Sequence, residues 1–489
     1  MKKQITILLV FLFSIIVVDQ AGIHFFAPAQ ANNIITTSNN ESINPDSLRH
    51  YTPEEVGMSS QTLSRIDSIV KDGIADRVFP GCQVFVMKDG KPIYDKCFGN
   101  YTYESVHKVL PTTMYDLASL SKTTGTLLAI MKLYDNSKLK LTDKASDYLT
   151  FLRGTDKENI TINELLFHES GLPAGLPFHT LAIEKNNTPS FLAAAKDTTH
   201  IVRLASKTLK YKEDWVSKIP SVEYTSQVSD SFYVNTRLHD AAMQMIAKTH
   251  LNSKAYVYSC VNFILLKEIT ETISGMTMDV LLNNEFYIPM KLNEMAYLPL
   301  RTHNKEEIAP TLKKDFLRNG LLQGYVHDPD AAFLGGVSGN AGLFATARDV
   351  AEVYQMLLNG GELNGKHYLS AETCTLFTTT TSASGRRGLG FDKPVTANQQ
   401  HSPCCISAPS AVYGHTGYTG TCCWVDPVND LVYVFLSNRT YPNDGVNKLA
   451  KKSIRPKIEE VIYQSMKLQT SKWEKVKILS SLTSKKALK

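Results

Sequence analysis

Strand-forming segments lie near both ends of this 489-residue chain. The apolar segments 81–88 and 92–98 flank Asp89-Gly90, a dipeptide typical of a hairpin turn. Near the other end, 413–425 and 431–436 are predicted as strands separated by a short turn. Because strands must bury their apolar faces together, one antiparallel sheet built from both ends of the chain is the simplest assembly.

Helical periodicity accounts for much of the remaining chain. Apolar residues recur at helical spacing over 52–74, before the first strand, and over 446–466, after the last. The sequence also predicts helices between the two groups of strands, at 116–135, 142–152, 160–166, 256–273, 276–286 and 347–358. We expect an α+β fold of two lobes: an antiparallel sheet flanked by the terminal helices, and a mostly helical lobe. A site would lie between the lobes, at the edge of the sheet.

Composition and charge narrow the function. The chain is 43% hydrophobic and 20% charged, which is ordinary for a globular protein. Its net charge of +5 is small and dispersed, so we expect no nucleic-acid partner. Among eight cysteines, the adjacent pairs Cys404-Cys405 and Cys422-Cys423 lack the spacing of zinc ligands. We interpret most cysteines as small buried residues, leave one or two disulfides open, and expect no metal site.

The N-terminal residues have the features of a secretory signal. Lys2 and Lys3 precede an apolar run over 5–18, and Ala29-Gln-Ala31 is a small-x-small cleavage site. The run is shorter than the ~20 residues of a membrane span. The pattern predicts a signal peptide over 1–31 and an exported protein, in the periplasm or at the cell surface. It would have no integral membrane domain after cleavage; an uncleaved anchor is the alternative.

The rest of the chain is predicted as one domain over 51–466. A flexible leader rich in Asn, Ser and Thr precedes it at 32–50, and a basic tail follows at 467–489. Within the domain, 174–252 mixes polar runs with aromatic residues, and a helix is expected at 191–205. We interpret 174–252 as a variable insertion that caps the site, because long irregular excursions often carry substrate contacts.

Ser119 and Lys122 are the first candidates for chemistry. They lie three residues apart at the start of a predicted buried helix, so the hydroxyl and the amine share a face. Burial of the lysine favours its neutral form, and a neutral lysine is a base for a serine nucleophile. Ser-x-x-Lys also occurs at three other places, Ser68/Lys71, Ser105/Lys108 and Ser137/Lys140. By itself the pattern more often marks a helix N-terminal serine beside a solvated lysine.

Two further motifs follow in order, each at the start of a predicted element: Tyr258-Ser-Cys260 and His415-Thr-Gly417. Acyl transfer needs a nucleophile, a proton relay and an oxyanion site. Tyr258 would relay the proton if neighbouring cations lower its pKa. The backbone N–H of Tyr418, beyond the third motif, would pair with that of Ser119 as an oxyanion hole.

With these motifs the chain resembles the serine beta-lactamase and penicillin-binding-protein superfamily, in its class C beta-lactamase and esterase-like branch. The branch carries Tyr-x-Asn in the middle and often His-Thr-Gly at the strand. Flanking segments agree: 79–84, 166–173, 339–347 and 414–421. The resemblance covers roughly 51–466. It implies a Ser119 acyl-enzyme, Lys122 as base, Tyr258 as relay, a site wall formed by His415, Thr416, Gly417 and Cys260, and no metal or organic cofactor.

One departure from this branch affects activity and specificity. Cys260 stands where this branch has Asn or Asp, and a thiol cannot replace the donors and acceptor of an amide; Asn262, two residues on, is a poor substitute. His415 replaces a lysine whose charge would hold a substrate carboxylate. We therefore expect a serine hydrolase acting on a small ester or amide, as an esterase or D-amino-acid peptidase. The substrate would be a small molecule or a peptide, with cell-wall peptides among the candidates. The alternatives are a beta-lactamase or D,D-carboxypeptidase, and a catalytically inactive relative that binds an envelope component.

Overall fold

The structure is a computed structural model that describes residues 18–19, 22–23, 51–184, 209–395 and 402–466. The chain divides into two units, Met1–Arg49 and His50–Lys489. In the first, β1 (Val18–Asp19) pairs antiparallel with β2 (Gly22–Ile23). The predicted cleavage site, leader, 191–205 helix and basic tail lie outside the described residues.

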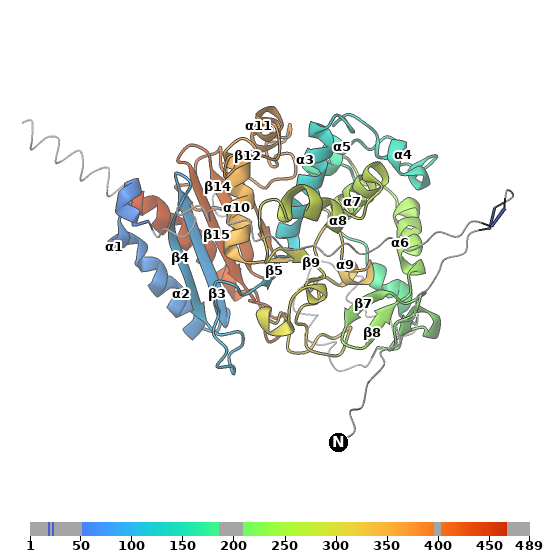
Figure 1. Cartoon of the computed structure of the whole chain (residues 1–489), viewed down its shortest axis with the longest axis horizontal. Coiled ribbons are helices and arrows are strands. Elements are labelled where there is room, and N and C mark those ends of the chain that lie inside the picture. Colours follow the sequence, from blue (N-terminus) through green and yellow to red (C-terminus); the bar gives the residue numbers. More distant parts are fainter. Residues whose placement is uncertain (1–17, 20–21, 24–50, 185–208, 396–401, 467–489) are drawn as a thin grey trace, which may run out of the picture. The chain divides into compact units, whose positions relative to one another are not determined.

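A five-stranded antiparallel sheet organises the second unit (Figure 1). Its strand order is β13-β14-β15-β3-β4, so the two N-terminal strands join the three C-terminal strands at the centre. The strands are β3 Gly81–Lys88, β4 Lys91–Gly99, β13 Tyr413–Gly417, β14 Thr421–Asp426 and β15 Leu431–Ser437. The prediction of one antiparallel sheet built from both ends of the chain is confirmed.

Both faces of this sheet are covered, which explains the unbroken apolar run of β15. Tyr433 and Phe435 pack on the side of the terminal helices, with Ile66 of α2. Val434 and Leu436 face the opposite side, in the large core of the helical lobe. The terminal helices are α1 Ser60–Leu63, α2 Arg65–Ala75, α12 Lys448–Lys451 and the helical residues 454–466. On the opposite side, α10 (Ala347–Leu358) lies along the sheet (Figure 1).

The remaining helices form most of the second lobe (Figure 1). Here α3 (Leu127–Asp135) packs against α7 (Cys260–Ser274) and α8 (Met278–Leu282). The other α-helices are α4 Ala145–Tyr148, α5 Ile162–Phe167, α6 Arg237–Lys248, α9 Pro329–Phe333 and α11 Ala371–Thr379. Short 3-10 or π helices are η2 Pro53–Val56, η3 Ala118–Leu120, η4 Lys122–Thr126, η5 Thr150–Leu152, η6 Phe178–Ala182, η10 Glu213–Trp215, η11 Asn283–Tyr287, η12 Pro299–Arg301 and η13 Lys305–Glu307.

Three small sheets complete the fold. One joins β5 (Tyr115–Asp116), β10 (Leu343–Ala345) and β9 (Ala296–Tyr297), and leads directly into η3. The other two are β11-β12, made of Glu362–Leu363 and Lys366–His367, and β6-β8-β7, made of Val216–Ser217, Phe232–Val234 and Ser226–Ser229. None of the three small sheets was predicted from the sequence. The described part of 174–252 is more regular than its mixed composition indicated, because it contains the sheet β6-β8-β7 and the helix α6.

Three predicted elements are interrupted. The segment 413–425 is not one strand, because a turn at Tyr418 to Gly420 folds it into the hairpin β13-β14. The C-terminal helix is broken at Ser453, whose φ of +51° ends α12. The helix predicted from Asp116 is instead a 3-10 turn followed by a π turn before α3 begins.

All eight cysteines are free thiols. Six are buried, as expected for small apolar residues, and Cys97 and Cys260 are partly buried. The sheet core thus holds Cys82, Cys422 and Cys423 without a disulfide between them.

A buried carboxyl group lies under the cysteine-rich loop and couples stability to pH. Glu459 is 2% exposed and accepts a hydrogen bond from the backbone N–H of Cys405 at 2.6 Å. Burial outweighs that hydrogen bond and raises the pKa of Glu459 from 4.5 to about 8.

We expect Glu459→Gln to remove a pH dependence of folding. The folded state holds the Glu459 proton more tightly than the unfolded state, so this stability is present below pH 4.5 and is lost as pH rises to about 8. Between those values the wild-type free energy of unfolding should fall relative to the variant's by up to about 1.4 kcal/mol per pH unit. Urea unfolding at pH 5, 6.5 and 8 measures it. The control is Glu460→Gln, because Glu460 is the adjacent residue and is partly exposed. If the free energy of unfolding changes with pH equally in the wild type and in Glu459→Gln, the assignment is wrong.

Candidate functional site

A tight turn presents Ser119. Ala118, just before it, has a φ of +48°, a strained conformation for a residue with a side chain. The buried Asp116 holds this turn: its Oδ1 accepts from the Ala118 N–H at 2.8 Å, and its Oδ2 accepts from the His327 N–H at 2.6 Å. Ser119 is the partly exposed member of its 3-10 turn, since Ala118 and Leu120 are buried. The strain therefore places the hydroxyl at the surface of the core.

Lys122 lies beneath Ser119 and is fully buried. Its Nζ donates to Ser119 Oγ at 3.1 Å and to the backbone carbonyl of Asn340 at 2.8 Å. Burial lowers the pKa of Lys122, but the neighbouring Cys260 and Tyr258 raise it by more, so the net pKa lies above its ordinary value. The expectation that burial leaves a neutral amine is therefore wrong for the resting site, where Lys122 is an ammonium.

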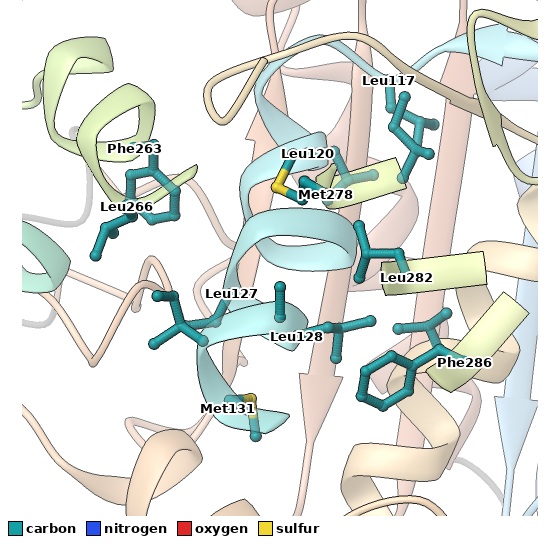
Figure 2. Packing of buried hydrophobic residues seen from close by; sticks show 14 of the residues in the cluster. Leu117, Leu120, Leu127, Leu128, Met131, Phe263, Leu266, Met278, Leu282 and Phe286 are labelled. Carbon is teal, nitrogen blue, oxygen red and sulfur yellow. The ribbon is translucent and has the colours of Figure 1, made fainter. Parts of the chain in front are cut away.

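Apolar packing holds the Ser119–Lys122 segment in place (Figure 2). Leu120, Leu127 and Leu128 are fully buried, and the residues opposite come from α7, α8 and η11. The side chains that Figure 2 labels opposite them are Phe263, Leu266, Met278, Leu282 and Phe286. Because these interiors are close-packed, the nucleophile and the amine are carried on a rigid element.

Tyr258 stands against Lys122 but makes no hydrogen bond through its hydroxyl to the described residues. The Lys122 Nζ lies 5.1 Å from the centroid of the Tyr258 ring. Burial raises the pKa of Tyr258 above its ordinary value, although Lys122 acts to lower it. A lowered Tyr258 pKa, the condition set for the proton relay, is therefore not found in the resting site, because loss of solvation outweighs the attraction of the nearby cation.

Two neutral histidines flank the Tyr258 ring. His415 lies with its ring centroid 5.9 Å away, and burial together with Arg387 lowers its pKa to about 3. Its Nδ1–H donates to the Thr416 carbonyl at 2.7 Å. His168 lies 4.7 Å away, and its Nδ1 accepts from the Ser259 N–H at 3.1 Å. His168 thereby fixes the backbone next to Tyr258, in agreement with a structural role at the end of α5.

Arg387 is a buried cation that the sequence patterns did not reveal. Its guanidinium carbon lies 5.2 Å from the Tyr258 ring centroid, and its Nε donates to Tyr256 Oη at 3.3 Å. The carboxylate of Asp392 is 3.7 Å away and is shared with Arg386. No motif surrounds Arg387, so only the fold, which brings 385–392 beside β13, could identify it.

Cys260 occupies the position that an amide takes in the related branch. Its Sγ is 3.6 Å from Lys122 Nζ, and burial raises the pKa of the thiol above its ordinary value, although Lys122 acts to lower it. Asn262 faces elsewhere, as predicted: its Oδ1 accepts from Ser170 Oγ at 2.7 Å, and its Nδ2 donates to His168. The site therefore has a thiol beside Lys122, at the position where the sequence comparison expects a side-chain amide.

The edge strand β13 runs past the Ser119 turn. A Cβ on Gly417 would lie 2.3 Å from the Leu117 carbonyl oxygen, so only glycine permits this approach. Just beyond, Thr419 Oγ1 and Thr421 Oγ1 donate to the carbonyls of Asp116 and Leu117. Among the described residues, no acceptor is found for the backbone N–H of Ser119 or Tyr418. The two proposed oxyanion donors are thus uncommitted on adjoining segments.

A cavity of about 270 Å³ opens at Ser119 and Tyr418. Its other walls include Phe316, His327 and Asp328. The structure brings together Ser119, Lys122, Tyr258, Cys260 and Arg387 around one point, with β13 alongside. Lys122, Tyr258 and Cys260 lie behind Ser119 and do not line the cavity.

The described ranges contain no group of three or more metal-binding side chains placed to hold an ion. Within the same ranges, no helix has the length and apolar character needed to cross a bilayer.

Comparison with known proteins agrees with this geometry. A family model described as Beta-lactamase matches residues 66–453. A curated protein named "Putative D-alanyl-D-alanine carboxypeptidase" from Salmonella agona (strain SL483) is 28% identical over 458 residues, covering 86% of this chain and 94% of its own.

Solved structures share the fold at lower identity. EstCE1, described as a hydrolase with promiscuous acyltransferase activity, gives a TM-score of 0.57 at 18% identity and covers 82% of this chain and 99% of its own. A penicillin-binding protein homolog from Caulobacter crescentus gives a TM-score of 0.55 at 18% identity, covering 83% and 98%. Since the family model spans well over half of the sequence, the chain belongs to the Beta-lactamase family and is a serine hydrolase.

Proposed function

We propose that Ser119 is the nucleophile of an acyl-transfer reaction on ester or amide substrates. The observation that carries this proposal is the contact of Ser119 Oγ with the buried Lys122 Nζ at 3.1 Å, at the wall of a cavity. Ser119 Oγ attacks the substrate carbonyl carbon, and the backbone N–H groups of Ser119 and Tyr418 receive the oxyanion. Collapse expels the alcohol or amine, and water releases the acyl group from Ser119 in a second step.

The proton balance assigns roles to Lys122 and Tyr258. Lys122 must first lose a proton, because its raised pKa makes it an ammonium at rest. The neutral amine then accepts the Ser119 proton. Tyr258, beside Lys122, gives its own proton to the leaving group and is reprotonated by the Lys122 ammonium. We assign Arg387 as a positioning residue that favours the ionised form of Tyr258 during this relay.

We infer that the substrates are small esters or D-amino-acid peptides, including those of the cell wall. The relatives named as D-alanyl-D-alanine carboxypeptidases support the peptide substrate. His415 is neutral, so it supplies no charge to hold a beta-lactam carboxylate, and Arg387 does not line the cavity. The pattern of 1–31 supports export to the periplasm or cell surface. We propose no cofactor, since the side chains already supply a nucleophile and a base.

Ser119→Ala should abolish acylation. The wild-type protein, incubated with an activated acetyl ester or a labelled penicillin, should gain the mass of one acyl group, and the variant should gain none. Turnover of the ester should fall by about 10³-fold or more. The measurement is intact mass together with ester hydrolysis. Ser68→Ala, in an exposed Ser-x-x-Lys match on α2, is the control. Absence of both adduct and turnover in the wild type across a broad ester panel would favour the inactive, envelope-binding alternative.

The activity should rise with pH into the alkaline range, because the resting Lys122 holds its proton above its ordinary pKa. Arg387→Gln should move this rising limb of kcat/KM to higher pH, since loss of a cation beside Tyr258 increases the proton affinity of the adjacent Lys122 and Tyr258. A shift of one unit lowers activity at fixed pH about tenfold. Arg386→Gln removes the same charge from the adjacent residue and is the control. The role of Arg387 would be overturned if the pH profile of kcat/KM stayed the same in folded Arg387→Gln, or if Arg386→Gln shifted it equally.

Cys260→Asn should favour amide over ester substrates. The asparagine would restore two N–H donors and a carbonyl beside Lys122, where the thiol now lies 3.6 Å away. One added hydrogen bond corresponds to a gain of up to about tenfold in kcat/KM for an amide relative to the matched ester. Cys260→Ser, which is polar but has no amide, separates the two effects. If Cys260→Asn and Cys260→Ser change kcat/KM for the amide and the ester by the same factor, Cys260 does not limit amide recognition.

A further inference from the structure

A second, larger cavity adjoins the Ser119 cavity. Its volume is about 820 Å³, compared with about 270 Å³ for the cavity at Ser119. Phe316 lines both cavities, and the chain around it alternates between them: Leu312 and Asp315 line the smaller one, and Lys313 and Lys314 the larger. The chain after Pro442 also borders both cavities: Asn443 lines the larger cavity, and Asp444 lines the smaller one. The same two segments therefore separate the two spaces.

The larger cavity presents free positive charge. Lys218, Lys313 and Lys314 line it and are exposed, and none of them lies within 4.0 Å of a carboxylate among the described residues. Of the two acidic residues of the lining, Asp230 is paired with a lysine, whereas Glu104 has no cation within 4.0 Å among the described residues. Asp230 pairs with Lys305 at 2.5 Å and accepts from Tyr325 Oη, and Glu104 accepts from Tyr441 Oη at 3.4 Å.

Arg318 does not add to this free charge. Its guanidinium forms two hydrogen bonds with the buried Asp315, so that pair is neutral. Tyr211 and Phe232 add aromatic surface, with their ring centroids 5.1 Å apart. The lining thus combines three unpaired lysines, which outnumber the single unpaired carboxylate of Glu104, with an apolar wall, and this suits a ligand that has both carboxylates and a carbon skeleton.

We propose that this cavity, named here the lysine cavity, binds the part of a peptide substrate remote from the reacting bond, and that this part carries carboxylates. The inference rests on the proposed acyl transfer at Ser119 and names its substrate class. With the reacting carbonyl at Ser119, a peptide passing Phe316 would place acidic side chains or a terminal carboxylate near Lys218, Lys313 and Lys314. Binding energy from this remote part would select acidic over neutral peptides.

The test compares two peptide esters that share the reacting acyl group and differ only in Glu against Gln beyond it. In the full-length protein, the triple variant Lys218→Gln, Lys313→Gln, Lys314→Gln should lower the Glu-to-Gln ratio of kcat/KM about tenfold, mostly through KM. Raising the salt should reduce the same ratio in the wild type. The matched control is Lys71→Gln, Lys138→Gln, Lys140→Gln, which removes three exposed lysines from outside this lining. Turnover of a small acetyl ester reports correct folding and active enzyme in every variant.

The outcomes separate this inference from the proposed function. The proposed role of the lysine cavity would be overturned if the Glu-to-Gln ratio of kcat/KM did not change in the triple variant, or if it fell equally in the control. Ester turnover in the same variants would still support acyl transfer at Ser119. If the wild type turns over no ester, binding of a fluorescent Glu peptide to Ser119→Ala still tests the cavity. Salt-sensitive binding that the triple variant weakens about tenfold supports it, and equal binding to the Gln peptide contradicts it.

Discussion

The burial of one ammonium group, that of Lys122, governs the architecture around the site. Removing a charged amine from water costs several kcal/mol unless polar groups receive it. In the described residues Lys122 has no carboxylate within 4.0 Å, and its three hydrogen-bond partners are the Ser119 hydroxyl, the Cys260 thiol and the Asn340 carbonyl. The fold must bring all three to one point from segments far apart in the chain.

The path of the main chain shows how that convergence is achieved. Gly339 lies so close to α7 that a Cβ would sit 1.8 Å from the Phe263 carbonyl oxygen, which sets Asn340 against Lys122. Thr126, at the end of the π turn, donates to the Gly339 carbonyl at 2.8 Å and fastens the same loop from the other side. The wide π turn and the strained Ala118 are local costs that hold the nucleophile above the amine.

Hydrophobic periodicity and ordered motifs were enough to predict the main sheet and most members of the site. The strands 81–88 and 431–436 and the helix 347–358 were predicted almost to the residue, because each is flanked by strong turn or capping residues. The convergence of Ser119, Lys122, Tyr258 and Cys260 was also predicted. Arg387 was not, because its relation to Tyr258 depends on pairing between 387–392 and β13 that no local pattern encodes. The pKa direction of Lys122 was wrong, and the lowered pKa required of Tyr258 is not found, because a sequence cannot weigh burial against a neighbour whose distance is unknown.

The distribution of charge distinguishes the two sides of Ser119. Behind it, Lys122 and Arg387 are cations, and their field together with burial keeps His168 and His415 neutral. In front, the Ser119 cavity is bordered by Asp328 and by Asp444, whose carboxylate lies 3.6 Å from Arg439. A reacting carbonyl would meet positive potential on the catalytic side, where its oxyanion forms, whereas no lysine or arginine of the described residues lines the open side. This distribution of charge stabilises the negative charge that develops on the oxyanion at Ser119. It offers no comparable partner to a carboxylate that the substrate already carries in the smaller cavity. Substrate carboxylates are therefore better placed in the lysine cavity, beyond Phe316.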